Sequence, residues 1–193
     1  MTFAITNLTK EIAMAWLAVT VAAGAACFFL CRHGRMQKHT GIGLTFLAGY
    51  LFFFLIVTLF DRAPTSYPRY KLELFWSYKA AIAGNRSLRA EVLWNVLLFV
   101  PIGYLLSAIL PRRKKWLACL IGMMLTLAIE GTQLVTHLGM FEFDDLISNT
   151  AGAVIGYAGY HVLRTLPWKG MQAFLFVLLC AAAAYMINGI AAV

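Results

Sequence analysis

The chain has 193 residues, of which 62% are hydrophobic and only 12% are charged. Soluble domains carry about 25% charged residues, so this composition excludes an ordinary soluble protein and indicates a lipid environment. The formal net charge of +8 does not indicate nucleic-acid binding, because the basic residues lie between apolar runs and form no separate basic domain. The four cysteines fall within apolar runs without any Cys/His cluster, so neither a disulfide framework, a metal site nor a cofactor is predicted.

Six apolar runs are long enough to cross a bilayer, since about 20 helical residues span its hydrocarbon core. In chain order they are Ile12–Cys31, Gly41–Phe60, Val92–Leu110, Trp116–Val135, Ile147–Leu163 and Met171–Val193. The first run lacks the small-residue cleavage site of a signal peptide, so we expect a retained helix. Residues 1–193 are therefore predicted to form one all-α domain, a polytopic membrane helix bundle.

A long loop, Asp61–Glu91, separates the second and third runs. Its segment Tyr70–Ala83 reads YKLELFWSYKAAIA and mixes aromatic with basic residues, which predicts a helix lying in the membrane interface. Pro64 and Pro68 prevent the second crossing from continuing into it. Anchoring of the bundle is the ordinary role of such a helix, with membrane lipids as its partners.

The basic residues predict how the bundle is oriented in its membrane. The first, third and fifth loops carry Arg32, Arg35 and Lys38, then Arg112–Lys115, then Arg164 and Lys169. Because short cytoplasmic loops are enriched in Lys and Arg, the odd-numbered loops are predicted to be cytoplasmic and both termini to face outward. The second loop, with six Lys and Arg residues, opposes this assignment, but the dense turn after Pro111 favours it.

Polar residues of three predicted helices gather toward one membrane face. Residues spaced three or four apart share one side of a helix, and the three polar helix ends meet at the same surface when neighbouring helices run in opposite directions. We call these residues the polar cluster, which consists of Glu91, Asn95, Glu130, Gln133, Asp144, Asp145 and Asn149. The cluster is the predicted functional or ligand-binding site, although no catalytic residue can be assigned.

Glu130 is the member that is hardest to explain by architecture alone. An ionised carboxylate at the bilayer centre costs roughly 2.5–3.5 kcal/mol, and Glu130 lies only ~8 Å below the end of its run at 1.5 Å per residue. It is therefore expected to face the bundle interior, with Gln133 and Asn95 as its first partners. Arg86 and Arg89 are the nearest cations in the sequence and are candidate anion-binding residues.

Architectural roles are also predicted for parts of this region. One of Asp144 and Asp145 is expected to cap the fifth helix, since free N–H groups at a helix start favour a carboxylate. As an alternative to a functional role, the side chains of Asn95, Gln133 and Asn149 form hydrogen bonds that join the helices. The structural residues proper are Pro101 and Gly103, a predicted kink or opening, and Gly152 with Gly156, a predicted close-packing seam.

The same residues resemble the VanZ-like family of bacterial membrane proteins. The matching motifs are FWSY (Phe75–Tyr78), EVLWNVLLFVPIG (Glu91–Gly103), IEGTQ (Ile129–Gln133) and FEFDDLISNTAGAVIGY (Phe141–Tyr157). Together they cover roughly residues 61–157 in the family's order and spacing. The resemblance implies an accessory protein of glycopeptide resistance, linked to reduced susceptibility to teicoplanin.

One departure from the family pattern concerns charge. Members often carry an arginine shortly before the aspartate pair, where this chain reads His137-Leu138-Gly139-Met140. If that arginine neutralises the carboxylates, either His137 or Arg89 must do so here, or the site has changed.

Three functions remain open at this point. The first is a cell-envelope protein whose outward-facing polar pocket engages a lipid-linked cell-wall precursor or a lipopeptide. The second is an enzyme acting on a lipid or peptidoglycan precursor, with Glu130 or Asp145 as general base. The third is a small proton-coupled transporter that uses Glu130 as a relay, which six helices without a detectable inverted repeat make less favourable. The ligand and the oligomeric state do not follow from the sequence.

Overall fold

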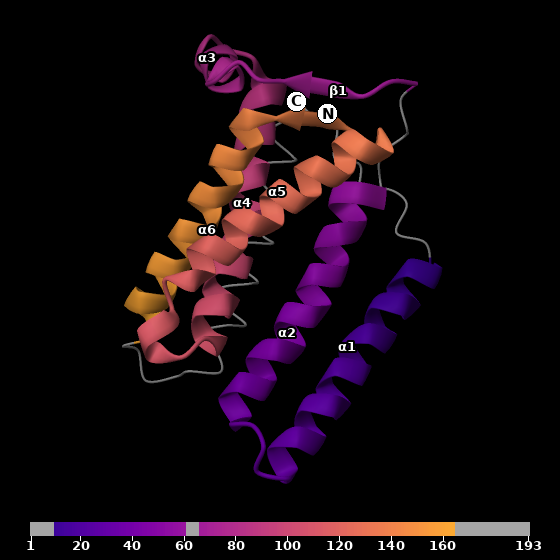
Figure 1. Ribbon diagram of the computed structural model, residues 1–193, viewed down its shortest axis with the longest axis vertical. Coiled ribbons are helices and arrows are strands. Elements are labelled where there is room, and N and C mark those ends of the chain that lie inside the picture. Colours follow the sequence, from indigo (N-terminus) through magenta and orange to yellow (C-terminus); the bar gives the residue numbers. More distant parts are fainter. Residues whose placement is uncertain (1–9, 61–65, 165–193) are drawn as a thin grey trace.

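The computed structural model describes residues 10–60 and 66–164, whose regular structure is helical apart from two three-residue strands. Five long helices lie side by side, and α3 with the strands lies at one end of them (Figure 1). The elements are α1 (Lys10–Arg32), α2 (Lys38–Leu55), the π-helical turn η2 (Ile56–Phe60), β1 (Arg69–Lys71), α3 (Trp76–Ile82), α4 (Arg86–Ile109), the 3-10 turn η3 (Arg112–Lys114), α5 (Leu117–Thr136), β2 (Met140–Glu142) and α6 (Phe143–Leu163).

Four of the described helices are long and apolar enough to cross a membrane, which confirms a membrane-helix protein. Their segments are Met14–Arg32, Lys38–Leu55, Arg86–Ile109 and Leu117–Thr136, at the positions of the first four predicted crossings. α6 occupies the fifth position and has 21 residues, but Asp144, Asp145 and its glycines lower its apolar content. Its crossing stays a prediction, and the sixth predicted crossing, Met171–Val193, lies outside the described residues.

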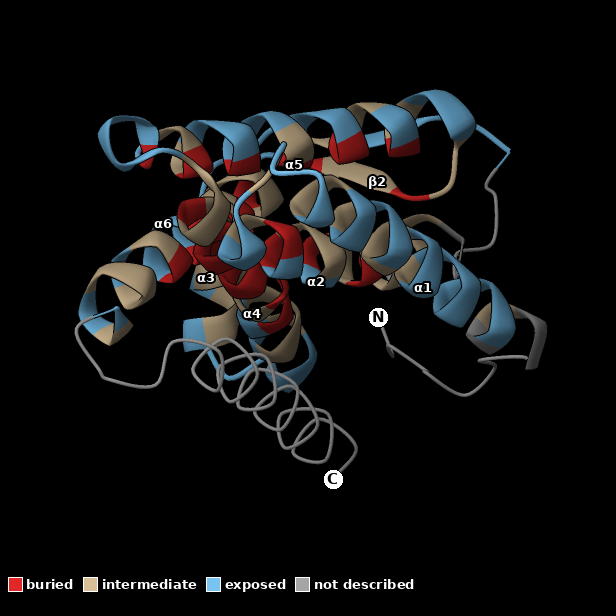
Figure 2. Ribbon diagram, turned by 90° about the horizontal axis from the view of Figure 1, so that it is seen from below, coloured by how far each residue is buried: buried red, intermediate tan, exposed pale blue. Residues whose placement is uncertain are grey.

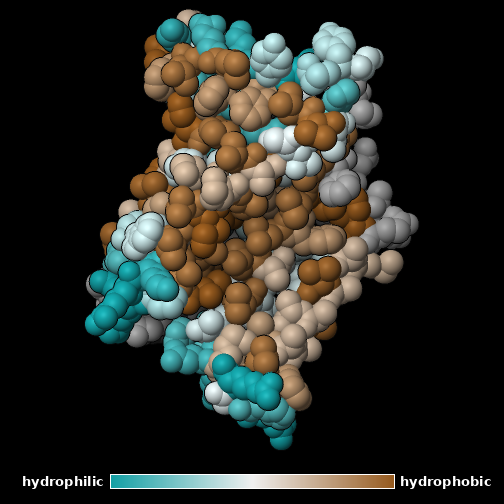
Figure 3. Space-filling view, in the orientation of Figure 1, coloured by the Kyte–Doolittle hydropathy of each residue, from teal (hydrophilic) through white to brown (hydrophobic). Residues whose placement is uncertain are grey.

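The surface carries an apolar band between two hydrophilic ends (Figure 3). One end holds the α1–α2 and α4–α5 connections and the end of α6, while the other holds α3, β1 and β2 (Figure 1). The first and third of the loops that were predicted to be cytoplasmic therefore lie at a common end of the bundle, while the fifth lies, beyond Arg164, outside the described residues. This end also carries the exposed basic turn η3.

A short parallel sheet joins the two loops at the other end. β1 pairs with β2, with Tyr70 opposite Phe141 and Lys71 opposite Glu142. The helix predicted over Tyr70–Ala83 is therefore wrong in its first half, because residues 69–71 take up strand pairing with the loop before α6. The helix forms over its second half as α3.

The backbones of α4 and α6 touch because three glycines lack side chains at the contact. A Cβ on Gly152 would collide with the carbonyl oxygen of Val96, and one on Gly156 with that of Val100. Gly103 of α4 faces the backbone of Ala153 in the same way. The predicted seam on α6 is thus a packing surface.

Pro101 lies inside α4, and the helix does not end there. Proline removes the N–H that would bond the carbonyl of Leu97. The hydroxyl of Tyr50, on α2, donates to the neighbouring carbonyl of Leu98 at 2.8 Å. α4 continues through Pro101 as one helix, and Gly103 allows close packing on α6. The kink or opening predicted at Pro101 and Gly103 stays a prediction.

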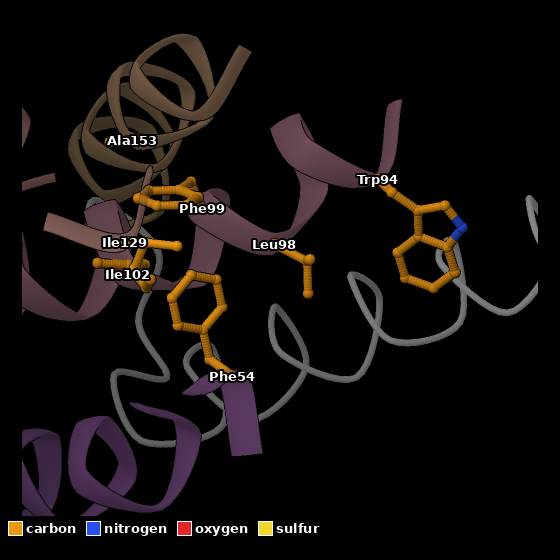
Figure 4. Packing of buried hydrophobic residues seen from close by; sticks show 7 residues of the cluster. All are labelled: Phe54, Trp94, Leu98, Phe99, Ile102, Ile129 and Ala153. Carbon is orange, nitrogen blue, oxygen red and sulfur yellow. The ribbon is translucent and has the colours of Figure 1, made fainter. Parts of the chain in front are cut away.

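The apolar core lies around α4, whose middle turns are buried among α2, α5 and α6 (Figure 2). Phe54 of α2 is fully buried and meets Phe99 edge to face, with 5.2 Å between ring centroids (Figure 4). Ile129 of α5 and Ala153 of α6 belong to the same buried apolar cluster. The cluster fixes the distances between the helices that carry the polar residues.

We predict that Gly156→Ala weakens the bundle, because its new methyl group must push the α4 backbone away. Overpacking of this kind costs about 1–3 kcal/mol, which lowers the melting temperature of the purified protein in detergent. Gly131→Ala is the matched control, since a Cβ at Gly131 meets nothing within 4 Å. Equal melting temperatures for the two variants would contradict the close contact of α4 with α6.

Candidate functional site

The predicted polar cluster surrounds a small cavity near the end of the bundle that carries α3 and the strands. The cavity gives the centre of a water molecule about 10 Å³ of space, which is room for about one water. It is lined by Phe54, Thr58, Asn95, Leu98, Phe99, Ile129, Glu130, Gln133, Asp145 and Asn149. Five of the seven predicted cluster residues are therefore brought together, from α4, α5 and α6.

Two hydrogen bonds tie α6 to its neighbours at this cavity. The amide nitrogen of Asn95 on α4 donates to the Asp145 carboxylate at 2.7 Å. The amide nitrogen of Asn149 donates to the hydroxyl of Thr126 on α5, also at 2.7 Å. Each bond joins two helices, so these carboxamides do serve as links between helices.

Glu130 and Gln133 of α5 add two hydrogen bonds to this network of polar side chains, one to β2 and one to η2. Glu130 is only 2% exposed, and its carboxylate accepts from the backbone N–H of Glu142 at 3.1 Å, at the end of β2. Gln133 is 1% exposed, and its amide nitrogen donates to the carbonyl of Thr58 in η2 at 3.1 Å. Asn95 and Gln133 were predicted as the first partners of Glu130, and all three line the same cavity. The nitrogen of Asn95 donates to Asp145 and that of Gln133 to Thr58, so a direct bond to Glu130 stays a prediction.

Asp144 stands outside the cavity and has a different role. Its side chain is fully buried and accepts from the backbone N–H of Phe75 at 2.6 Å. It also accepts from the N–H and hydroxyl of Ser77, at 2.9 and 2.6 Å. Asp144 therefore caps the start of α3 and not the start of α6, where Glu142 is the N-cap residue. An aspartate of the pair does cap a helix, as predicted, but the capped helix is α3 and not α6.

The start of α3 needs this partner because its backbone turns sharply there. Phe75 adopts a left-handed conformation with φ of 62°, and no side chain of its own segment caps the helix. The first N–H groups of a helix have no partner within it, and a buried carboxylate supplies one. Asp144 thus holds α3 against the first turn of α6.

A second contact between α3 and α6 joins the hydroxyls of Tyr78 and Ser148, 2.6 Å apart. Burial raises the pKa of Tyr78 above its ordinary value of 10.0, and the nearby Asp144 and Asp145 carboxylates add to this while the Ser148 hydrogen bond opposes it. The phenol is therefore neutral throughout the physiological range and remains a hydrogen-bond donor.

The remaining predicted residues do not join the cavity. Glu91 is partly exposed and is not among the lining residues. Arg86 is exposed, and Arg89 directs its guanidinium to the carbonyl of Ala81, near the end of α3, at 3.4 Å. Neutralisation of the aspartate pair by Arg89 or His137 stays a prediction. His137 is the left-handed C-cap of α5, with φ of 58°.

Three network residues were missed by the sequence reasoning. Ser77 stands within the FWSY motif, which gave a signal that was used only for resemblance. Thr126 precedes Glu130 by four residues and so shares its side of α5, a spacing that could have found it. Thr58 contributes through its backbone carbonyl, for which no side-chain pattern exists.

The cavity supplies mainly oxygen acceptors. No group of three or more His, Cys, Asp and Glu side chains that could hold a metal ion occurs among residues 10–60 and 66–164. The arrangement is suited to a group that donates hydrogen bonds or carries positive charge, because carboxylates and amide oxygens accept.

Comparison with known proteins gives one match. A family model described as VanZ/LLP1 matches residues 41–164. The matched segment runs from α2 to the end of α6 and is wider than the region of residues 61–157 that the motifs covered. No match was found among the curated proteins or among the solved structures.

We predict that Asp144→Ala releases the start of α3. Leaving buried N–H groups without an acceptor costs about 1–3 kcal/mol, so amide hydrogen exchange at Ser77 and Lys79 should become faster while the middle of α4 stays protected. Glu91→Gln, which removes a carboxylate outside the network, is the control and should leave exchange unchanged. Unchanged protection of α3 in Asp144→Ala would show that the cap is not needed.

Proposed function

Because the chain belongs to the VanZ/LLP1 family, we propose that it is an accessory protein of the bacterial cell envelope. It binds the anionic head group of a lipid-linked or cell-wall component at the end of the bundle that carries α3. Through this binding it contributes to resistance to glycopeptides such as teicoplanin or to lipopeptides. The observation that carries the proposal is a basic and aromatic surface held directly above the buried polar network.

This surface is formed by the cap layer, defined as residues 69–82. Tyr70 and Phe75 are 64% and 50% exposed there, although both are large apolar side chains. Arg69 and Lys79 of the same layer are also exposed. Exposed aromatic rings suit the interface of a membrane, and cations beside them attract anionic head groups.

Arg86 and Arg89 border the cap layer at the start of α4 and are the candidate anion-binding residues. Both side chains are exposed. Each Lys or Arg near an anionic lipid surface contributes about 1 kcal/mol of attraction. A guanidinium also presents several N–H donors to one phosphate, so the pair favours a phosphorylated head group over a neutral one.

The head group binds on the cap layer and not inside the cavity. The cavity has room for about one water molecule, whereas a phosphate or sugar is several times larger. The two sites are connected, since Asp144 holds the cap layer while its neighbour Asp145 lines the cavity. A change in the network therefore alters how the cap layer is presented.

The orientation in the bacterial cytoplasmic membrane is part of the proposal. The connections that carry Arg35 and η3 share the opposite end of the bundle, and dense short basic loops favour the cytoplasmic side. The cap layer then faces outward, where cell-wall components are exposed to glycopeptides.

We predict that the double variant Arg86→Gln/Arg89→Gln binds a polyprenyl pyrophosphate in nanodiscs roughly 30-fold more weakly than the wild type. This follows from the loss of about 2 kcal/mol of attraction. The matched control is Arg112→Gln/Arg113→Gln, which removes the same charge from the opposite end and should bind as the wild type does. Equal losses in both double variants would indicate attraction by net charge alone.

We also predict that cells producing Glu130→Gln at the wild-type level become as susceptible to teicoplanin as cells that lack the protein. The variant keeps the shape of residue 130 but loses the carboxylate that accepts from Glu142. The measurement is the minimal inhibitory concentration, and Glu91→Gln, which alters a partly exposed carboxylate outside both the cap layer and the cavity lining, serves as the control. Wild-type resistance in Glu130→Gln cells would count against a functional network.

A further inference from the structure

The side chain of Gln133 is oriented by a partner that can only accept hydrogen bonds. Its amide nitrogen donates to the backbone carbonyl of Thr58 at 3.1 Å. Because a carbonyl cannot donate, the nitrogen and not the oxygen must be the atom in this contact. Chemistry therefore fixes which end of the amide faces Thr58, a choice that is otherwise difficult to make for a glutamine. The amide oxygen, Oε1, is left for a different donor.

No residue that the structure describes donates to Oε1 of Gln133. The atom is buried, in a side chain that is 1% exposed and lines the cavity. Buried acceptors in native proteins nearly always have a donor, which is either a protein group or an ordered water molecule. An acceptor without one is destabilising, because it has lost its bonds to solvent. The donor to Oε1 is thus expected to come from the cavity.

The cavity wall has the polar character of a hydrated site. Thr58 of the π-helical turn η2, Asn95 of α4 and Asn149 of α6 line it together with Gln133. Cavities that stay empty are lined by apolar side chains, whereas a buried water molecule makes two to four hydrogen bonds to polar groups. The two asparagines supply the partners that a water molecule needs besides Gln133.

The size of the cavity limits the donor to one small molecule. Its volume of about 10 Å³ admits one particle of the size of a water molecule. The hydroxyl or amine of a larger ligand would bring further atoms, for which this volume has no room. A single neutral donor is enough to satisfy Oε1 of Gln133.

We propose that this cavity binds one water molecule, which donates a hydrogen bond to Oε1 of Gln133. Its remaining bonds are made with the carboxamides of Asn95 and Asn149. The water molecule thereby joins α5 to α4 and α6, and it holds Gln133 in the position from which its nitrogen donates to Thr58. This site goes beyond head-group binding and does not depend on it.

The experiment is hydroxyl-radical labelling of the full chain in nanodiscs, in buffer without ammonium. Short X-ray pulses split bound water into hydroxyl radicals, and these oxidise the side chains beside it even when the side chains are buried. Phe54 and Phe99 line the cavity and are at most 1% exposed. They should be oxidised several-fold faster than Tyr104, an aromatic residue that is 3% exposed, belongs to another buried cluster and does not line the cavity.

Gln133→Leu removes Oε1 and should slow the oxidation of Phe54 and Phe99 to the rate of Tyr104. Glu91→Gln, which alters a carboxylate outside the cavity lining, is the matched control and should keep the fast oxidation. The proposal is overturned if Phe54 and Phe99 of the wild type are oxidised no faster than Tyr104, a comparison that needs no variant. It is also overturned if folded Gln133→Leu is labelled as the wild type is. Head-group binding to the cap layer is measured separately and is unaffected by either outcome.

Discussion

Polar groups that leave water must find partners inside the protein, and this requirement determines how the helices meet at one end of the bundle. Asp144 receives three hydrogen bonds from the cap layer, and Asp145 receives one from Asn95. Hydrogen bonds between membrane helices contribute only about 0.6 kcal/mol on average, whereas a buried carboxylate without partners costs far more. The network therefore contributes mainly by making other arrangements of the helices unfavourable, since these would leave carboxylates without partners. A displaced α6 would leave the buried Asp144 and the partly buried Asp145 without these donors.

Close packing of α6 on α4 fixes the relative position of these two helices, which the hydrogen bonds alone do not determine. Gly152 and Gly156 bring the backbone of α6 onto α4, and this contact sets the height at which Asp145 meets Asn95. Phe54 closes the apolar side of the cavity from α2. The same bundle thus holds a water-sized, acidic space beneath a layer that presents cations and aromatic rings outward. In our proposal the layer recognises an anionic head group, and the buried network keeps the layer in place.

The sequence was sufficient to predict features that depend on residues of one helix. Apolar length predicted the first four membrane helices, and spacing along each helix brought Glu130, Gln133, Asp145 and Asn149 to one place. It failed where the outcome depends on contacts between distant segments. Pairing of β1 with β2 needs two short segments from different loops, and neither has a strand pattern of its own. The capping of α3 by Asp144 has the same cause, since its donors lie 67 and 69 residues earlier in the chain.

The most direct test of this account is a double-mutant cycle on Asn95→Ala and Asp145→Ala, with the free energy of unfolding measured in detergent. If polar groups of α4 and α6 meet in one buried network, the two substitutions are coupled by about 0.5–3 kcal/mol, as residues in contact are. The coupling should disappear when Asn95→Ala is combined with Glu73→Gln, whose carboxylate is exposed in the cap layer. Effects of Asn95→Ala and Asp145→Ala that add within about 0.5 kcal/mol would contradict the convergence on which everything else depends.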